Sequence, residues 1–321
     1  MAKPVLKVKK EKNGSYKATV PCTEMLSYVF EKNLPDPDTS FNDIIRCLQD
    51  ETKKIFAKTK PRPKTPTSNS FNNCNGRWAE YVFGAYVWNY LVGKNIANMQ
   101  NNDPIRFVYV KLPTNNSKRD AWISLLIKKQ YDTLIGFERD DTDKQVKAAG
   151  HKAFRLCSSN PDSVILKFEE KDCIQYGLDP MKTIDNLSDA NIKLMDSVFS
   201  KLVGKVAIEE NFQCFLSIKK SIRPDRRYQF VHEGDDVKAI IMLLCTNTTL
   251  RLNVGSVPDF CQKRFYAFSL NGVNSADEEC MDTATTACIS SPMMGLIWCV
   301  DRLFSCFKPS EIQNEMNEIM K

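Results

Sequence analysis

Residues 212–234, FQCFLSIKKSIRPDRRYQFVHEG, contain two elements from which the rest of the chain can be placed. Residues 212–220 are typical of a strand, and the two-residue period of a strand puts Ser217 and Lys219 on one face. Pro224 suits the first turn of a helix, which we predict over residues 224–245. A strand followed closely by a long helix favours an α/β fold with a helix-covered sheet.

The predicted helix carries one acidic side chain among apolar ones. Phe230, Val237, Ile241 and Leu244 recur at helical spacing and form the buried stripe, and Glu233 falls on the same stripe. Desolvating an unpaired charge costs several kcal/mol, so Glu233 requires a cation, either a side chain or a metal. The structural alternatives are a glutamate on the helix surface or a buried ion pair with an arginine.

Carboxylates and a lysine in this arrangement are typical of metal-dependent phosphodiester hydrolysis. The carboxylates hold a divalent cation, and the lysine orients the attacking water and steadies developing charge. In many nucleases these residues form the sequence motif PD…(D/E)xK. The Pro-Asp pair alone has little weight, because the chain holds five such pairs, beginning at Pro35, Pro37, Pro161, Pro224 and Pro258.

One apparent completion of this motif fails on geometry. Seven residues of strand separate Asp162 from Glu169, and at about 3.3 Å each they span roughly 23 Å. No turn former lies between the two acids, so they cannot share a metal. Lys219 offers a better completion, in which Ser217 stands where the acid usually lies and Glu233 supplies the missing carboxylate.

The remaining chain is predicted to mix helices and strands. Helices are expected at residues 40–57, 77–92, 128–149, 189–202, 293–307 and 310–320, and strands at residues 106–112, 152–157, 162–168, 250–257 and 265–270. Residues 58–66 contain three prolines and four cations and are expected to form an extended linker or a DNA-backbone arm. We expect one compact domain, with a basic helical extension over 1–69, a core over 70–292 and C-terminal helices over 293–321.

Composition narrows the class of protein. Lys and Arg number 45 against 39 Asp and Glu, and the formal charge of +6 permits a nucleic-acid partner without requiring one. The longest apolar stretches, residues 240–245 and 293–300, are far shorter than the roughly 20 residues of a membrane helix. Twelve cysteines without a CxxC pair, two histidines and a lysine-rich start indicate reduced thiols, no zinc cluster and a cytoplasmic protein without a membrane partner.

Residues 217–234 closely resemble the active-site segment of CCGG-family type II restriction endonucleases. In this variant of the PD-(D/E)xK superfamily, the second acid has moved to the helix after the strand. Residues 70–80, SFNNCNGRWAE, and residues 159–162, SNPD, are similar to the same family and occur in the same order. The resemblance implies a restriction-endonuclease-like α/β fold with a central mixed sheet. It also implies Mg²⁺-dependent double-strand cleavage of DNA at a palindromic site with a CCGG core.

The resemblance assigns roles to individual residues of the metal site. It makes Asp162 the central metal ligand, Lys219 the catalytic lysine and Glu233 the relocated acid. It adds Glu80 as a further acid that reaches the metal, and the backbone carbonyl of Ile218 as another candidate ligand. From its place in an aromatic helix alone, Glu80 would be interpreted as a salt-bridge partner.

The segment between the predicted strand and helix carries the candidate DNA-reading residues. Arginine can bind guanine O6 and N7 through two hydrogen bonds, and a carboxylate can accept from cytosine N4, so Arg223, Asp225 and Arg226 suit adjacent G·C pairs. In the resembling family this cluster reads CCGG. Its structural alternative is a surface ion-pair cluster in which Asp225 caps the helix. Asn73 is a minor-groove candidate by comparison with relatives, and a helix-entry residue by local sequence.

These assignments predict the products and the partners of the reaction. We expect 5′-phosphate ends and, by resemblance, a cut before the first cytosine. A palindromic site implies two-fold symmetry, so a homodimer or a homotetramer is expected, together with a cognate DNA methyltransferase. One rival is a structure-selective or repair nuclease of the same fold, which cuts without sequence preference. The other is a catalytically silent DNA-binding protein, which would lack the lysine or an acid.

Overall fold

The computed structural model describes residues 4–113, 121–139, 148, 160–222, 224–247, 264–285 and 297–321. At its centre lies a five-stranded sheet of order β3-β4-β5-β6-β7. The strands are β3 (Ile105–Lys111), β4 (Ser163–Glu169), β5 (Phe212–Lys219), β6 (Arg264–Ser269) and β7 (Arg302–Ser305). Strands β3, β4 and β5 pair antiparallel, whereas β5, β6 and β7 pair parallel, so the sheet is mixed as predicted.

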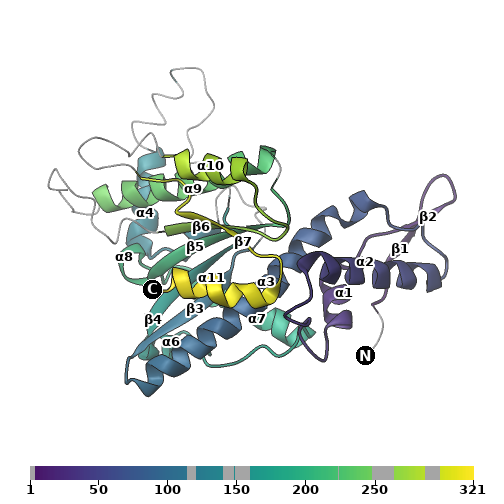
Figure 1. The fold of residues 1–321 in the computed structure, drawn as a ribbon, viewed down its shortest axis with the longest axis horizontal. Helices are drawn as coiled ribbons and strands as arrows, with labels where there is room; N and C mark the ends of the chain where they lie inside the picture. Colours follow the sequence, from purple (N-terminus) through teal and green to yellow (C-terminus); the bar gives the residue numbers. More distant parts are fainter. Residues whose placement is uncertain are drawn as a thin grey trace.

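Helices cover both faces of this sheet. Figure 1 shows α9 and α10 above the strands and α3, α7 and α11 below them. Their bounds are α3 (Ser68–Gln100), α7 (Asp189–Leu202), α9 (Pro224–Asn247), α10 (Ser275–Thr283) and α11 (Ile312–Ile319). Strand β5 is buried at every position except Gln213, because it lies mid-sheet between two helical layers. The near-continuous apolar pattern of residues 212–218 follows from this position.

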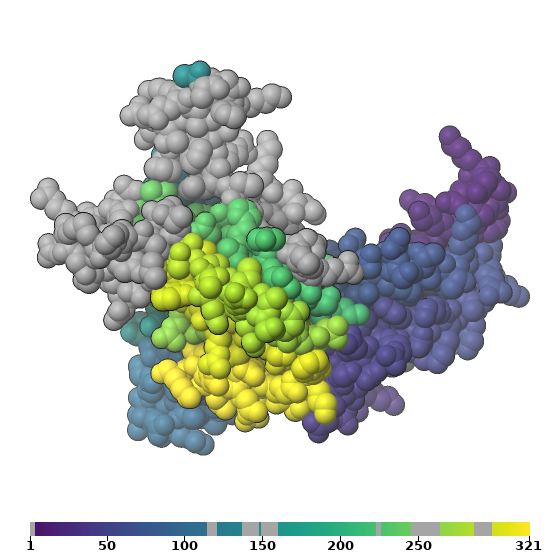
Figure 2. Space-filling view, turned by 45° about the horizontal axis from the view of Figure 1, so that its top comes forward, coloured from purple at the N-terminus to yellow at the C-terminus, as the bar shows by residue number. Residues whose placement is uncertain are grey.

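Shorter elements complete the fold. The helices are α1 (Cys22–Val29), α2 (Phe41–Lys58), α4 (Lys128–Arg139), α6 (Glu170–Gln175) and α8 (Ile208–Asn211), with single 3₁₀ turns at Ala121–Leu125 and Pro309–Glu311. A hairpin of β1 (Val8–Lys10) and β2 (Tyr16–Ala18) precedes them. Figure 2 shows the purple and blue N-terminal region projecting to one side of the green and yellow core. Within the described part of the chain, no helix combines the length and apolar composition needed to cross a bilayer.

Helix α3 links the N-terminal extension to the sheet. In its first half, Cys74 is joined to Cys22 and the indole nitrogen of Trp78 donates to the Cys22 carbonyl at 2.7 Å. In its second half, Trp88 donates to the Lys182 carbonyl at 2.7 Å. The helix spans 33 residues, twice the predicted length, and extends past both predicted ends. Its early start was not predicted because the asparagine-rich first turns have low helix propensity. Residue Asn73 therefore lies within the helix and not at its entry.

Several other expectations match the structure closely. The predicted elements at 40–57, 106–112, 162–168, 189–202, 212–220, 224–245 and 265–270 all agree with the observed bounds to within two residues. The cap of α2 differs from the Asp38 or Thr39 that the sequence favours: it is Ser40, whose Oγ accepts from the backbone nitrogen of Asp43 at 3.1 Å. Part of the basic linker runs beside the hairpin, where the Lys64 backbone nitrogen donates to the Tyr16 carbonyl at 2.8 Å.

Two expectations are wrong. The helix predicted at residues 293–307 is replaced in its described part by strand β7, since a short apolar run fits a buried strand as well as a helix. The expectation of reduced thiols fails at Cys22 and Cys74, which form a disulfide with a Cα–Cα distance of 5.2 Å. A separation of 52 residues gave no sign that α1 and α3 bring these cysteines together. The predicted strands at 152–157 and 250–257 lie outside the described residues.

Candidate active site

Two neighbouring strands bring Asp162 and Lys219 together. Because β4 and β5 are antiparallel, the start of β4 lies beside the end of β5, and the Asp162 backbone nitrogen donates to the Leu216 carbonyl at 3.1 Å. The carboxylate oxygen Oδ2 of Asp162 accepts from the Ile218 backbone nitrogen at 2.6 Å. The ammonium of Lys219 lies 3.5 Å from the same oxygen. Two residues that are 57 positions apart thus meet through strand pairing alone.

Glu233 enters the same group from helix α9. Its side chain is 0% exposed, as expected for a residue on the buried stripe. Its oxygen Oε1 lies 3.4 Å from Lys219 Nζ and accepts from Gln229 Nε2 at 2.9 Å. Lys219 is therefore one cation that compensates the buried carboxylate of Glu233.

Ser217 lies between the two acids. Its hydroxyl is within 3.5 Å of Asp162 Oδ2 and forms a short hydrogen bond with Glu233 Oε2. The prediction that Ser217 and Lys219 share one face of the strand is confirmed by their common contacts with both acids. Ser217 takes the place of the usual acid, and its hydroxyl connects Asp162 with the acid supplied by the helix.

The charge state of Lys219 follows from its surroundings. Burial alone would lower the pKa of its ammonium, but the carboxylates of Asp162 and Glu233 act in the opposite direction and outweigh burial. The net pKa is raised above its ordinary value. Lys219 is therefore a positively charged hydrogen-bond donor held by two acids.

A second lysine accompanies the remaining acid. Glu80, on α3, has a side chain that is 21% exposed, and its Oε2 lies 3.1 Å from the ammonium of Lys111 at the end of β3. Burial and the charge of Asp162 raise the pKa of Glu80, while Lys111 lowers it. The interpretation of Glu80 as a salt-bridge partner is thus confirmed. The sequence did not single out Lys111, whose only signal is a charge at the end of a largely apolar strand.

These side chains border one cleft. The cleft has a volume of about 640 Å³, and its walls include Glu80, Asp162, Ile218, Lys219 and Arg226. Asn73 is exposed on α3 between Asn72 and Asn75, which line the cleft. Arg223 and the side chain of Asp225 lie outside the described residues. The structure therefore brings the candidate catalytic residues together with one of the three candidate base-reading residues.

The donor atoms of the cleft fit a hard divalent cation. Among the described residues, no three His, Cys, Asp or Glu side chains are grouped closely enough to hold a metal by themselves. Mg²⁺ is usually bound by only one or two carboxylates, with water and substrate phosphate completing the shell. The carbonyls of residues two apart in a strand point the same way. The Ile218 carbonyl thus points to the same side as that of Leu216, which faces Asp162. The cleft thus offers oxygen ligands for a metal ion, but the protein does not supply a complete coordination shell.

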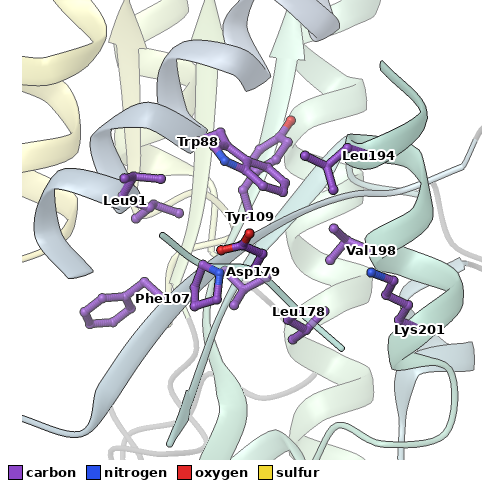
Figure 3. Close-up of a pocket in the computed structure, with 12 residues that line it drawn as sticks. Trp88, Leu91, Phe107, Tyr109, Leu178, Asp179, Leu194, Val198 and Lys201 are labelled. Carbon is purple, nitrogen blue, oxygen red and sulfur yellow. The ribbon is translucent and has the colours of Figure 1, made fainter. Parts of the chain in front are cut away.

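A second hollow lies farther along α3. Figure 3 shows Trp88, Leu91 and Tyr109 around it, with Leu194 and Val198 from α7. It measures about 20 Å³, room for a single water molecule. Its walls are mainly apolar, so the large polar cleft, and not this hollow, is the candidate site.

Comparison with solved structures defines the class of fold. The crystal structure of the type IIF restriction endonuclease Bse634I with cognate DNA matches with a TM-score of 0.79 and 24% identity, covering 99% of this chain and 98% of that chain. A second structure, of Bse634I restriction endonuclease, matches with a TM-score of 0.78 and 24% identity over the same shares. The chain has the restriction-endonuclease fold, and its acid–lysine cleft occupies the ends of the central strands.

Comparison with protein families gives the particular group. A family model described as Cfr10I/Bse634I restriction endonuclease matches residues 9–321. The type II restriction enzyme Cfr10I of Citrobacter freundii is 23% identical over 256 residues, which cover 79% of each chain. The chain belongs to the Cfr10I/Bse634I restriction endonuclease family. It is therefore a type II restriction endonuclease, a site-specific deoxyribonuclease, and not a repair nuclease or a silent DNA-binding protein.

Proposed function

We propose that this enzyme cleaves both strands of DNA at a palindromic site with a CCGG core, in an Mg²⁺-dependent reaction. The observation that supports it most strongly is that one short segment of the chain, from Ser217 to Glu233, carries residues of both kinds, catalytic and base-reading. Within it lie Lys219, which contacts both acids, and Arg226, which borders the same cleft. A base reader attached directly to the catalytic strand couples recognition to cleavage, because a slip of one base would misplace the phosphate.

The proposed chemistry is in-line attack of water at phosphorus, which breaks the P–O3′ bond and leaves 5′-phosphate and 3′-hydroxyl ends. Mg²⁺ would be held by Asp162 and the Ile218 carbonyl together with one further carboxylate, Glu80 or Glu233, and it would supply Lewis acidity at the scissile phosphate. Lys219 donates hydrogen bonds from its ammonium toward the attacking water and the phosphate oxygens, and offsets the negative charge that develops there.

Glu233 and Ser217 prepare Lys219 for this task. Glu233 holds the ammonium at 3.4 Å from within the protein, on the buried side of the site. Ser217 bonds to Glu233 and approaches Asp162, so the two acids keep a fixed separation. The lysine is thus oriented before DNA arrives, which reduces the reorganisation that the reaction requires.

Recognition is assigned to Arg223, Asp225 and Arg226, which lie at or just before the start of α9 in the sequence. Arg223 and Arg226 would bind guanines, and Asp225 would accept from cytosine N4, with the cut before the first cytosine. Arg227 supports the start of α9 through an ion pair with the buried Asp277 of α10. Asn73, exposed beside the cleft, is proposed to contact the minor groove.

The assembly follows from the symmetry of the site. A palindromic sequence presents two equivalent scissile phosphates, so we propose a homodimer or a homotetramer in which each subunit cuts one strand. A DNA methyltransferase of the same specificity would protect the host sites. The oligomeric state is measurable by light scattering of the purified protein.

Digestion of plasmid DNA tests the proposal. Purified enzyme with Mg²⁺ is expected to give discrete fragments whose sequenced ends fall within CCGG, and a chelator is expected to abolish them. Lys219→Ala should lose cleavage but retain specific binding in Ca²⁺. Arg226→Ala should lose about 1–3 kcal/mol of specific binding per lost base contact. Random smearing, or equal loss of both functions in both variants, would refute the proposal.

A further inference from the structure

Lys111 is a buried lysine at the edge of the cleft. Its side chain is 7% exposed, and its Nζ lies 3.1 Å from Glu80 Oε2 and 4.8 Å from the ring centroid of Tyr81. The Tyr81 hydroxyl in turn lies 2.8 Å from both carboxylate oxygens of Asp196 on α7. Side chains from α3, β3 and α7 thus form one connected group, the Lys111 cluster: Glu80, Tyr81, Lys111 and Asp196.

The cluster limits the freedom of the Lys111 ammonium. Burying an ammonium costs several kcal/mol unless an opposite charge and hydrogen bonds compensate. Here the Glu80 carboxylate supplies the charge, and the face of Tyr81 adds a cation–π contact. The bond to Asp196 fixes the orientation of the Tyr81 ring. Lys111 is therefore held in place by two side chains of α3, one of which is itself bonded to α7.

The same contact orients Glu80. Its oxygen Oε2 is bound by Lys111, whereas Oε1 lies toward Gly76, 3.9 Å from the position of a β-carbon there. Gly76 and Asp162 both line the cleft. The negative charge of Asp162 opposes a second carboxylate nearby, and the positive charge of Lys111 offsets this repulsion. Because Lys111 binds Oε2, the other oxygen of Glu80, Oε1, lies toward Gly76 and the cleft.

We propose that Lys111 is a positioning residue of the metal site, which holds Glu80 with one oxygen presented to the cleft that Asp162 shares. The inference rests on the proposed function, in which Glu80 reaches the metal. Residues that orient a metal ligand typically change metal affinity or activity by about 10- to 100-fold when they are replaced. The competing interpretation is that Lys111 only joins α3 to β3.

Metal-dependent DNA binding distinguishes the two interpretations. The Ca²⁺ concentration that gives half-maximal binding of a CCGG duplex is measured by fluorescence anisotropy, which requires no cleavage. Lys111→Met, of similar length but uncharged, is expected to raise this concentration about tenfold, with a parallel rise in the Mg²⁺ needed for cleavage. Lys111→Arg, which keeps the charge, is expected to restore most of the affinity. Combining Lys111→Met with Glu80→Gln should add little to Glu80→Gln alone.

Lys238→Met is the matched control. Lys238 is equally buried, at 4% exposure, and pairs with Asp301 at 2.7 Å outside the cleft. Its replacement should lower the melting temperature without shifting the Ca²⁺ midpoint. If Lys111→Met does not fold, the shorter, uncharged Lys111→Gln is measured instead.

The outcomes separate this inference from the proposed function. A Lys111 variant with an unchanged Ca²⁺ midpoint, or a loss fully additive with that of Glu80→Gln, overturns the positioning role while wild-type binding stands. A wild-type protein that does not prefer the CCGG duplex to a scrambled duplex overturns the proposed function, and this inference with it.

Discussion

Replacing Gly234 by alanine sets two opposing effects against each other in helix α9. Alanine is more favourable than glycine within a helix by about 1 kcal/mol, so the substitution alone would stabilise α9. A β-carbon at residue 234 would, however, lie 2.0 Å from the carbonyl oxygen of Cys299 and 2.7 Å from its carbonyl carbon. Both are backbone atoms, so no side-chain rotation relieves the overlap.

The overlap decides the sign of the effect. Ordinary van der Waals contact lies at 3.4–4 Å, so α9 and the segment around Cys299 must separate by more than about 1 Å. Overpacking costs about 1–3 kcal/mol, and a clash with backbone atoms lies at the upper end of this range. After the gain of about 1 kcal/mol in helix propensity, the free energy of unfolding should fall by about 2 kcal/mol. The displacement also moves the neighbouring Glu233 away from Lys219. A misplacement of about 1 Å can reduce the rate roughly 100-fold.

Urea unfolding followed by circular dichroism measures the stability, and initial rates of plasmid cleavage measure the activity. Gly93→Ala in α3 is the control, because a β-carbon there meets no described atom within 4 Å. It should be slightly more stable than the wild type and equally active. A Gly234→Ala protein as stable and as active as Gly93→Ala would refute the packing argument.

Four further outcomes are expected. Arg227→Met removes the partner of the buried Asp277 and should lower stability by about 2 kcal/mol, less than for a fully buried pair because the guanidinium is partly exposed. His232→Ala, at an exposed site on the same helix, should leave the urea midpoint unchanged. Glu233→Gln removes a charge that balances Lys219, the proposed catalytic lysine, and should slow cleavage about 100-fold in rapid-quench assays; an undiminished rate would contradict its role. Cys22→Ser should lose about 2–4 kcal/mol against the oxidised wild type, and a loss that persists against the reduced wild type would exclude the cross-link as its cause.

The parts of the site that local pattern determines could be predicted from the sequence. Strand periodicity placed Ser217 beside Lys219, and helical periodicity placed Glu233 on the buried stripe of the next helix. The mixed sheet and the enzyme class were predicted through the family resemblance. In each case the decisive residues lie within one strand, one helix or one short motif.

The remaining features depend on contacts between distant segments. Lys111 and Glu80 are 31 positions apart on different elements, and nothing in either element reveals the other. The disulfide of Cys22 and Cys74 likewise requires the crossing of α1 and α3. The sequence predicts a helix where β7 lies, because the strand is defined by its pairing with β6, which the local residues do not encode.

The continuity of α3 makes the N-terminal extension and the sheet one mechanical unit. Glu80 lies midway along the helix, after Trp78, which is bonded to the extension, and before Trp88, which is bonded to the core. A continuous helix transmits displacement along its axis because each turn is hydrogen-bonded to the next. Any displacement of the extension is therefore carried directly to a carboxylate of the cleft.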